Sequence, residues 1–421
     1  MPLLAPVIKA ARARAEEMKR ALGTAQVAAR RSALAPRWLP LPGKSGRRPW
    51  VGPPDAVPVM AGAPDGRPAG ALSAAGGRHI HVAVDGTSHT VQLSNGAHFI
   101  LAAAVASGPP PPGQRDRGDL EILPARYDDA QAASARDLLM RSLEAFVASE
   151  AAGALVQEGL APEAVLWVDG SLYADLSHMA GAPGQVRWGG GVERAGTLLR
   201  TTAGLLHLAE HQGLWLIGIG KTQRAGFLAD ALSGLAPAPR PGRTGRGIIH
   251  DLDDVTPGFE ERLGDGELLA VAPAGWSWPL VLDGTRFPLL SSAAAETFKD
   301  CPAIVSCYLR PHPADLPLRV DIPASAVGLD DRLLAGTGGQ PSRPWPAWVP
   351  DPAAVRPVIE AVMAAYGGVR AYNGPLYAVD RLVRLSRRDV EMRYLPICAR
   401  VAGLPLDSLS INRGRRRFLS S

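Results

Sequence analysis

The sequence predicts an α/β protein built on a mixed sheet, and three observations carry this prediction. Short apolar runs rich in β-branched residues begin near residue 78, two long segments carry apolar residues at helical spacing, and strands alternate with helices after the third strand. The chain has 421 residues, of which 46% are hydrophobic and only 20% are charged. Such a chain can bury a large core, which excludes a disordered protein.

The first three predicted strands follow one another closely. His79–Val84 ends at Asp85, Thr90–Leu93 comes next, and His98–Val105 is the third. Each run is apolar and contains residues that favour extended backbone. Because the connections are so short, we expect these strands to form an antiparallel meander.

Helices and strands alternate after the meander. Asp128–Gln157 is a long predicted helix, Ala164–Val168 is a strand that ends at Asp169, Glu193–Glu210 is a second helix, and Leu214–Ile219 is a fifth strand. The succession strand, strand, strand, helix, strand, helix, strand (βββαβαβ) is the order of a ribonuclease-H-like sheet. We therefore predict an α/β fold with a ribonuclease-H-like mixed sheet.

Inserted and C-terminal elements extend this predicted core. Gly and Pro punctuate the sequence beyond about residue 225, with short strands predicted at Leu268–Val271, Pro279–Leu282 and Ile304–Leu309. Helical spacing then returns at Ala353–Tyr366 and Leu376–Leu385. We expect these segments to add strands and helices to the same domain.

Composition divides the chain into three predicted regions. Residues 1–77 are predicted to be a helical arm followed by a linker rich in Pro, Gly and Arg, residues 78–400 the folded domain, and residues 401–421 a basic tail. No apolar run of about 18 residues and no signal peptide is evident, so we expect a cytoplasmic protein with no membrane partner. Three cysteines are too few for a disulfide framework or a Cys-based zinc site.

The charge balance favours a polyanionic partner. The net charge is +5 and the isoelectric point is about 9.3. Guanidinium groups suit phosphates, and the last part of the chain is dense in them. These arginines are Arg381, Arg384, Arg387, Arg388, Arg393, Arg400, Arg413, Arg415, Arg416 and Arg417. A solvated helix face with a frayed tail is the alternative, and it explains Arg413, Arg415, Arg416 and Arg417 equally well.

Three acidic side chains are expected to meet at one edge of the sheet. In the predicted order the first and fourth strands are parallel neighbours, so Asp85 and Asp169 at their C-terminal ends lie close together. Each is followed by Gly and a hydroxyl residue, which predicts a turn that leaves the carboxylate pointing outward. Glu144 lies on the apolar side of the first helix and should face the sheet. Three oxygen ligands without a Cys or His cluster favour Mg²⁺ or Mn²⁺ over Zn²⁺.

The motifs resemble those of the NurA family of nucleases over roughly residues 78–400. VAVDGT at Val82–Thr87 resembles the family's first motif, Glu144 its helical glutamate, and Asp169 in LWVDGS its second aspartate. Lys221 in LWLIGIGKT resembles a lysine that ends a family strand, and Tyr372 in AYNGPLYAVDR resembles a tyrosine near the C-terminus. The order and spacing of five motifs are more specific than any one of them.

Two positions depart from the family pattern. Thr87 stands where serine is usual, and Asp380 stands where the family has a histidine or a similar polar residue eight positions after the tyrosine. The threonine keeps the hydroxyl. Asp380 leaves open whether that position is a base, a ligand or a structural partner.

The resemblance implies a manganese- or magnesium-dependent nuclease of single- and double-stranded DNA. It implies exonuclease and single-strand endonuclease activity, a homodimer, and joint action with a hexameric HerA-type ATPase in DNA-end resection and repair. In the implied two-metal mechanism Asp85 bridges two ions, while Glu144 and Asp169 complete their shells. Lys221 would neutralise charge on the phosphate, and Tyr372 would position the nucleotide or the water.

Other interpretations stay open from the sequence. An Asp-Gly-hydroxyl tripeptide is usually only a turn, Glu144 could pair with Arg141 or Arg136 on the helix surface, and Tyr372 could be a packing residue. An actin-like ATPase would need a second strand-rich half, which residues 225–350 do not supply. The stronger alternative is a catalytically inactive partner that binds or regulates the ATPase.

Overall fold

The computed structural model describes residues 80–93, 97–108, 117–125, 127–172, 191–221, 228, 265–269, 274–282, 302–329, 347–349 and 352–397. The predicted arm and linker at 1–77 and the predicted basic tail at 401–421 lie outside these residues, as does Arg400. Among the described residues, no helix combines the length and the apolar character needed to cross a membrane.

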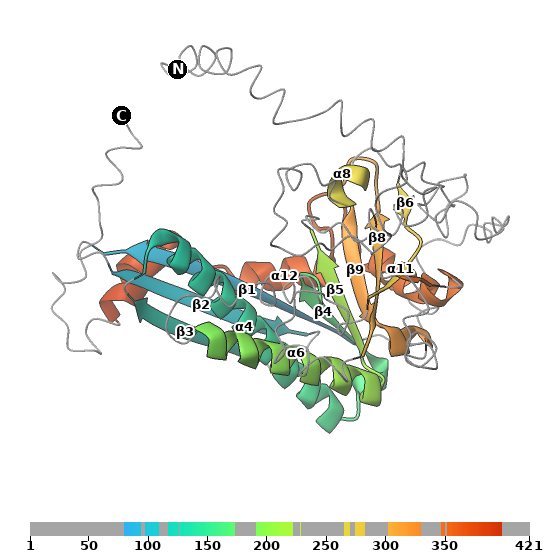
Figure 1. Cartoon of the computed structure of the whole chain (residues 1–421), viewed down its shortest axis with the longest axis horizontal. Helices are drawn as coiled ribbons and strands as arrows, with labels where there is room; N and C mark the ends of the chain where they lie inside the picture. The colour runs from blue at the N-terminus through green and yellow to red at the C-terminus, as the bar shows by residue number, and fades with distance from the viewer. Residues whose placement is uncertain are drawn as a thin grey trace, which may run out of the picture.

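One mixed sheet runs through the described part of the chain (Figure 1). Its strand order is β10-β7-β8-β9-β5-β4-β1-β2-β3, with β6 paired to β8. The strands are β1 Ile80–Gln92, β2 His98–Ser107, β3 Arg117–Ala125, β4 Ala164–Asp169, β5 Trp215–Gly220, β6 Gly275–Trp276, β7 Leu280–Leu282, β8 Ile304–Arg310, β9 Leu318–Pro323 and β10 Ala347–Trp348. β1 pairs with β2, and β2 with β3, in antiparallel fashion, whereas β4 runs parallel to both β1 and β5.

The meander differs from the prediction in how its strands are divided. The predicted first and second strands are one 13-residue strand, β1, which continues straight through Asp85, Gly86 and Thr87. The predicted turn at this position is therefore wrong. Gly86 pairs with Ala104 of β2, so cross-strand pairing outweighs the local turn preference of Asp-Gly. The third strand is β3, which the pattern of apolar runs does not predict because its residues are largely polar and partly exposed.

Two helices cover one face of the central strands (Figure 1). They are α4, Asp129–Gln157, and α6, Gly191–Gln212, close to their predicted bounds. Asp128 caps α4 by accepting from the backbone N–H of Gln131, whose side chain accepts from the Asp128 N–H in return. Apolar side chains of both helices pack with alternate residues of β1, β4 and β5 in one core.

The other sheet face is covered by α11, Arg356–Ala365, and α12, Gly374–Val383. Along β4, Leu166 packs into the core under α4, whereas Val165 and Trp167 pack into the core under α11 and α12. Successive strand residues point to opposite faces, so a strand covered on both sides is apolar throughout. This explains the continuous apolar runs of β4 and β5.

Short elements complete the described chain. They are η2 Ala161–Glu163, α8 Asp265–Leu269, η5 Ala324–Val327, η6 Pro352–Val355, α13 Arg387–Asp389 and a π-helical turn, η7, at Val390–Tyr394. The predicted strand at Leu268–Val271 is wrong where it is described, because Leu268 and Leu269 end helix α8. Cys307 is buried in β8 as a free thiol.

The packing of α4 on the sheet yields a stability prediction. Leu139 of α4 is fully buried against the sheet, whereas Phe146 on the same helix is 47% exposed. We expect Leu139→Ala to lower the free energy of unfolding by about 2–5 kcal/mol, because it leaves a cavity. Phe146→Ala should cost no more than about 1 kcal/mol. Urea unfolding measures both, and equal losses would contradict the described orientation of α4.

Candidate metal centre

Strand pairing brings the two aspartates of the Asp-Gly motifs together. Val84 of β1 pairs with Val168 of the parallel strand β4, and the next residues along the two strands are Asp85 and Asp169. Asp169 is the last residue of β4, and Gly170 follows it with a φ of 118°. The predicted turn is therefore present after Asp169, although Asp85 lies inside a continuous strand.

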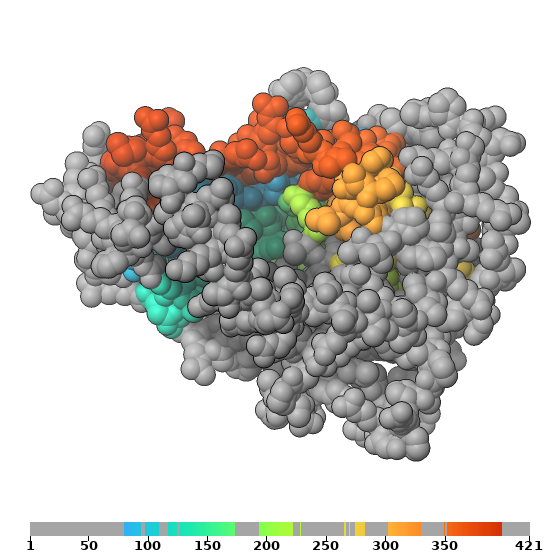
Figure 2. All heavy atoms as spheres, turned by 90° about the horizontal axis from the view of Figure 1, so that it is seen from above, coloured from blue at the N-terminus to red at the C-terminus, as the bar shows by residue number. Residues whose placement is uncertain are grey.

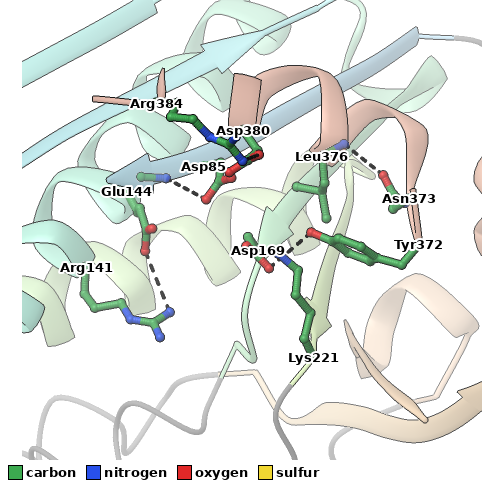
Figure 3. Close-up of polar contacts among 11 residues, drawn as sticks. Asp85, Arg141, Glu144, Asp169, Lys221, Tyr372, Asn373, Leu376, Asp380 and Arg384 are labelled. Carbon is green, nitrogen blue, oxygen red and sulfur yellow. Dashed lines mark hydrogen bonds and ion pairs between the residues drawn. The ribbon is translucent and has the colours of Figure 1, made fainter. Parts of the chain in front are cut away.

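Glu144 faces the sheet, as its helical position predicts. It is only 6% exposed, and a Cβ atom placed on Gly86 would lie 2.5 Å from its Oε1 atom. The carboxylate therefore packs directly against the backbone beside Asp85 (Figure 3). Gly86 is required here for close approach of a side chain and not for a turn.

Arg141 links Glu144 to the turn that follows Asp169. Its Nη1 atom lies 3.7 Å from Glu144 Oε2, so the ion pair weighed from the sequence is present even though Glu144 faces the sheet. The same Nη1 atom would lie 2.8 Å from a Cβ atom on Gly170. Both glycines of the two motifs thus leave room for neighbouring side chains.

Lys221 and Tyr372 converge on Asp169 (Figure 3). Lys221 directly follows β5, and its Nζ lies 2.7 Å from Asp169 Oδ2. The Tyr372 hydroxyl donates to Asp169 Oδ1 at 3.4 Å, and Lys221 Nζ lies 4.3 Å from the centroid of the Tyr372 ring. Tyr372 also packs against the core under α11 and α12, so it makes both a packing contact and a polar contact.

Asp380 adds a fourth carboxylate near the centre. It lies on α12 and forms an ion pair with Arg384, one turn further on, at 3.0 Å. Figure 3 shows Asp380 beside Asp85, and its negative charge contributes to raising the pKa of Asp85.

The C-terminal segments lie next to earlier segments on the surface of the molecule. Seen from above, the C-terminal segments, in red, border surface atoms of earlier segments coloured blue to lime (Figure 2).

Burial and like charge make Asp85 an unusual acid. Desolvation, and then the negative charge of Asp169, raise the pKa of Asp85 from 3.8 to about 7. The Gly86 N–H, 2.8 Å from Asp85 Oδ1, and the Lys221 ammonium act in the opposite direction. Burial, together with the charges of Asp169 and Asp85, also raises the pKa of Tyr372, which therefore stays protonated. A bound cation would relieve this repulsion.

The carboxylates of Asp85, Glu144 and Asp169 come from β1, α4 and β4, and among the described residues this set of oxygen donors suits Mg²⁺ or Mn²⁺. Asp85, Glu144 and Asp169 do not form a closed cage as they stand. Among the described residues, one trio of His, Cys, Asp or Glu has all its ligand atoms within 4.8 Å of one another. That trio is His207, Glu210 and His211.

The histidine-containing trio is separate from the acidic centre. It lies near the C-terminal end of α6, directly before β5 begins at Trp215. Lys221 follows the opposite end of β5, and a strand of six residues spans about 20 Å. The trio therefore cannot supply ligands to an ion held beside Asp169.

One acid next to the centre was not anticipated from the sequence. Asp321 of β9 is fully buried and contacts the residues that follow Asp169-Gly170. The segment LRVDIP alternates apolar and charged residues, which is typical of a strand with one solvated face, so the sequence pattern does not indicate that Asp321 is buried.

The comparisons with known proteins give weak similarities. No protein-family profile and no curated protein matches the sequence. Three similar solved structures are the NurA nuclease from Sulfolobus solfataricus (16% identity, 77% of this chain and 84% of that chain, TM-score 0.41), NurA with manganese (10%, 85% and 90%, 0.42), and NurA bound to dAMP and manganese (11%, 94% and 96%, 0.40). Similarity at this level does not establish membership of a family.

The close approach of Glu144 to Gly86 can be tested by a double-mutant cycle. Gly86→Ala should lower the free energy of unfolding by about 1–3 kcal/mol, because its Cβ overlaps the Glu144 carboxylate. The cost should shrink in a Glu144→Ala background. Gly153→Ala is the matched control, since a Cβ at that helical position meets nothing within 4 Å. An equal cost of Gly86→Ala in both backgrounds would contradict the contact.

The raised pKa of Asp85 predicts how stability depends on pH in the absence of metal. A carboxyl group whose folded pKa is about 7 and whose ordinary pKa is 3.8 takes up a proton on folding between these values, so stability falls as pH rises through this window. Asp85→Asn removes the buried charge. Its stability advantage over wild type should be larger at pH 8 than at pH 5 by on the order of 2 kcal/mol.

Urea unfolding in EDTA at the two pH values measures this difference. Asp137→Asn serves as the control, because the Asp137 side chain is 60% exposed on α4 and should show no comparable change with pH. If the advantage of Asp85→Asn were the same at both pH values, Asp85 would not be the titrating group.

Proposed function

We propose that this chain is a metal-dependent DNA nuclease that hydrolyses phosphodiester bonds, with exonuclease and single-strand endonuclease activity. The observation that carries the proposal is the register of β1 and β4, which sets Asp85 beside Asp169, while Glu144 of α4 packs against Gly86, the residue after Asp85. Burial of such carboxylates is costly unless a cation shares the site. The resemblance of five sequence motifs to NurA nucleases supports the choice of DNA as substrate.

The acidic residues would hold the metal ions. Asp85 would be the shared ligand of two Mn²⁺ or Mg²⁺ ions, and Glu144 and Asp169 would complete their shells. Bound divalent ions supply Lewis acidity for attack of water on phosphorus and for departure of the 3′ oxygen. Asp85 must lose its proton before it binds metal, so metal affinity should fall below about pH 7.

Lys221 and Tyr372 would act on the substrate side of Asp169. The Lys221 ammonium, 2.7 Å from Asp169 Oδ2, can turn toward a scissile phosphate and offset its negative charge. The Tyr372 hydroxyl keeps its proton and can donate to the water or to a nucleotide oxygen. Asp380 lies beside Asp85 and pairs with Arg384, and it would hold that arginine close to the bound DNA strand.

The proposed setting is DNA-end resection and repair, together with a hexameric HerA-type ATPase and as a homodimer. This part of the proposal rests on the motif resemblance alone. A second candidate is a catalytically inactive partner that binds or regulates the ATPase. It is favoured by Asp380 in place of the family's histidine, and by the pairing of Glu144 with Arg141 and of Asp169 with Lys221.

Cleavage of end-labelled linear DNA tests the catalytic proposal. Wild-type protein should degrade single- and double-stranded DNA with Mn²⁺ and should be inactive in EDTA. Asp85→Asn should lower the rate by at least about 100-fold, because bound metal contributes several kcal/mol to transition-state stabilisation. Asp137→Asn, an exposed aspartate of α4, should leave the rate unchanged.

Two outcomes would decide against the nuclease. Retained cleavage by Asp85→Asn would assign the activity to another site or to a contaminant. Absence of cleavage by wild type, both alone and with the HerA-type ATPase present, would favour the inactive partner.

A further inference from the structure

A buried ion pair lies next to the turn that follows Asp169. Arg319 and Asp321 of β9 are 1% and 0% exposed. Arg319 Nε donates to Asp321 Oδ1 at 2.8 Å and lies 3.0 Å from the Ser306 hydroxyl oxygen of β8. Burying two charges is costly and adds little stability compared with apolar residues, so the pair calls for another explanation.

The second carboxylate oxygen of Asp321 binds the turn itself. Asp321 Oδ2 accepts from the hydroxyl of Ser171 and from the backbone N–H of Leu172, the latter at 3.0 Å. These two residues directly follow Asp169-Gly170 in the chain. One carboxylate oxygen thus accepts from two successive residues, so Asp321 fixes both of them.

The remaining contacts of the turn leave it little freedom. The Gly170 N–H donates to the carbonyl oxygen of Ile219 in β5 at 2.9 Å. A Cβ atom on Gly218 would lie 2.8 Å from the Gly170 carbonyl oxygen, so the turn packs directly on the β5 backbone. Gly218 in turn pairs with Asp321 across the two strands. All three residues after Asp169 are therefore fixed to β5 or β9.

We propose that Asp321 is a positioning residue of the metal centre, which acts through Ser171 and Leu172 to hold the Asp169 carboxylate in register with Asp85. Arg319 pairs with Asp321 in the core and holds its carboxylate in place. The inference rests on the proposed function, because it assigns Asp169 to a metal ion. It also gives the hydroxyl of the second Asp-Gly-hydroxyl motif a task that differs from that of Thr87, which lies within a strand.

Direct Mn²⁺ binding tests this role without using catalysis. Electron paramagnetic resonance of free Mn²⁺ during titration of the full chain gives the affinity. Ser171→Ala removes one donor and leaves both buried charges in place, so we expect about 10–100-fold weaker binding. Ser171→Thr, which keeps the hydroxyl, should restore affinity. Ser142→Ala is the matched control, because that hydroxyl donates within α4 to the Leu138 carbonyl oxygen, and its loss should not change binding.

A second variant separates positioning from folding. Asp321→Asn keeps the side-chain shape and should weaken Mn²⁺ binding at least as much as Ser171→Ala, with circular dichroism showing whether the variant is folded. If it unfolds, Ser171→Ala and its threonine rescue decide alone. A purely structural role would lower the melting temperature of Ser171→Ala and leave its Mn²⁺ affinity unchanged, which would overturn the proposal.

The pattern of results separates this inference from the function on which it rests. Mn²⁺ binding by wild type that is lost in Asp85→Asn but unchanged in Ser171→Ala would refute only the positioning role. A wild-type chain that binds no Mn²⁺ would refute the metal centre, and the positioning role with it.

Discussion

The arrangement of the site depends on one electrostatic constraint, the repulsion between two carboxylates on adjacent parallel strands. Asp85 and Asp169 are brought together by β-sheet register and not by side-chain flexibility, so the chain cannot relax the repulsion by moving them apart. The surrounding groups reduce this repulsion in two ways. A proton is retained on Asp85 to about neutral pH, and the ammonium of Lys221 pairs with Asp169. A bound metal cation can replace either of these positive charges, which connects the fold to the proposed chemistry.

The parts of this structure that follow from local physics could be predicted from the sequence. The helix that carries Glu144 has an Asp128 cap and apolar spacing over its whole length, so both its bounds and its buried face were predictable. The proximity of Asp85 and Asp169 followed from the parallel pairing of two apolar strands. Lys221 followed because it ends the next parallel strand.

The parts that were missed depend on contacts between distant segments. Asp-Gly favours a turn locally, but pairing with β2 keeps β1 extended through Gly86. β3 escaped notice because its residues are polar and partly exposed. The buried pair Arg319 and Asp321 is unfavourable when either residue is considered alone, and it becomes acceptable only when each neutralises the other and the turn after Asp169 supplies donors.

The contact between Glu144 and Gly86 also bears on how tolerant this chain is to sequence change. Because the glutamate side chain occupies the space where any Cβ would lie, a residue other than glycine at position 86 forces Glu144 to move. The two positions lie far apart in the chain and are expected to vary together. In a saturation mutagenesis screen, position 86 would resemble a chemically essential residue although it has no side chain to contribute.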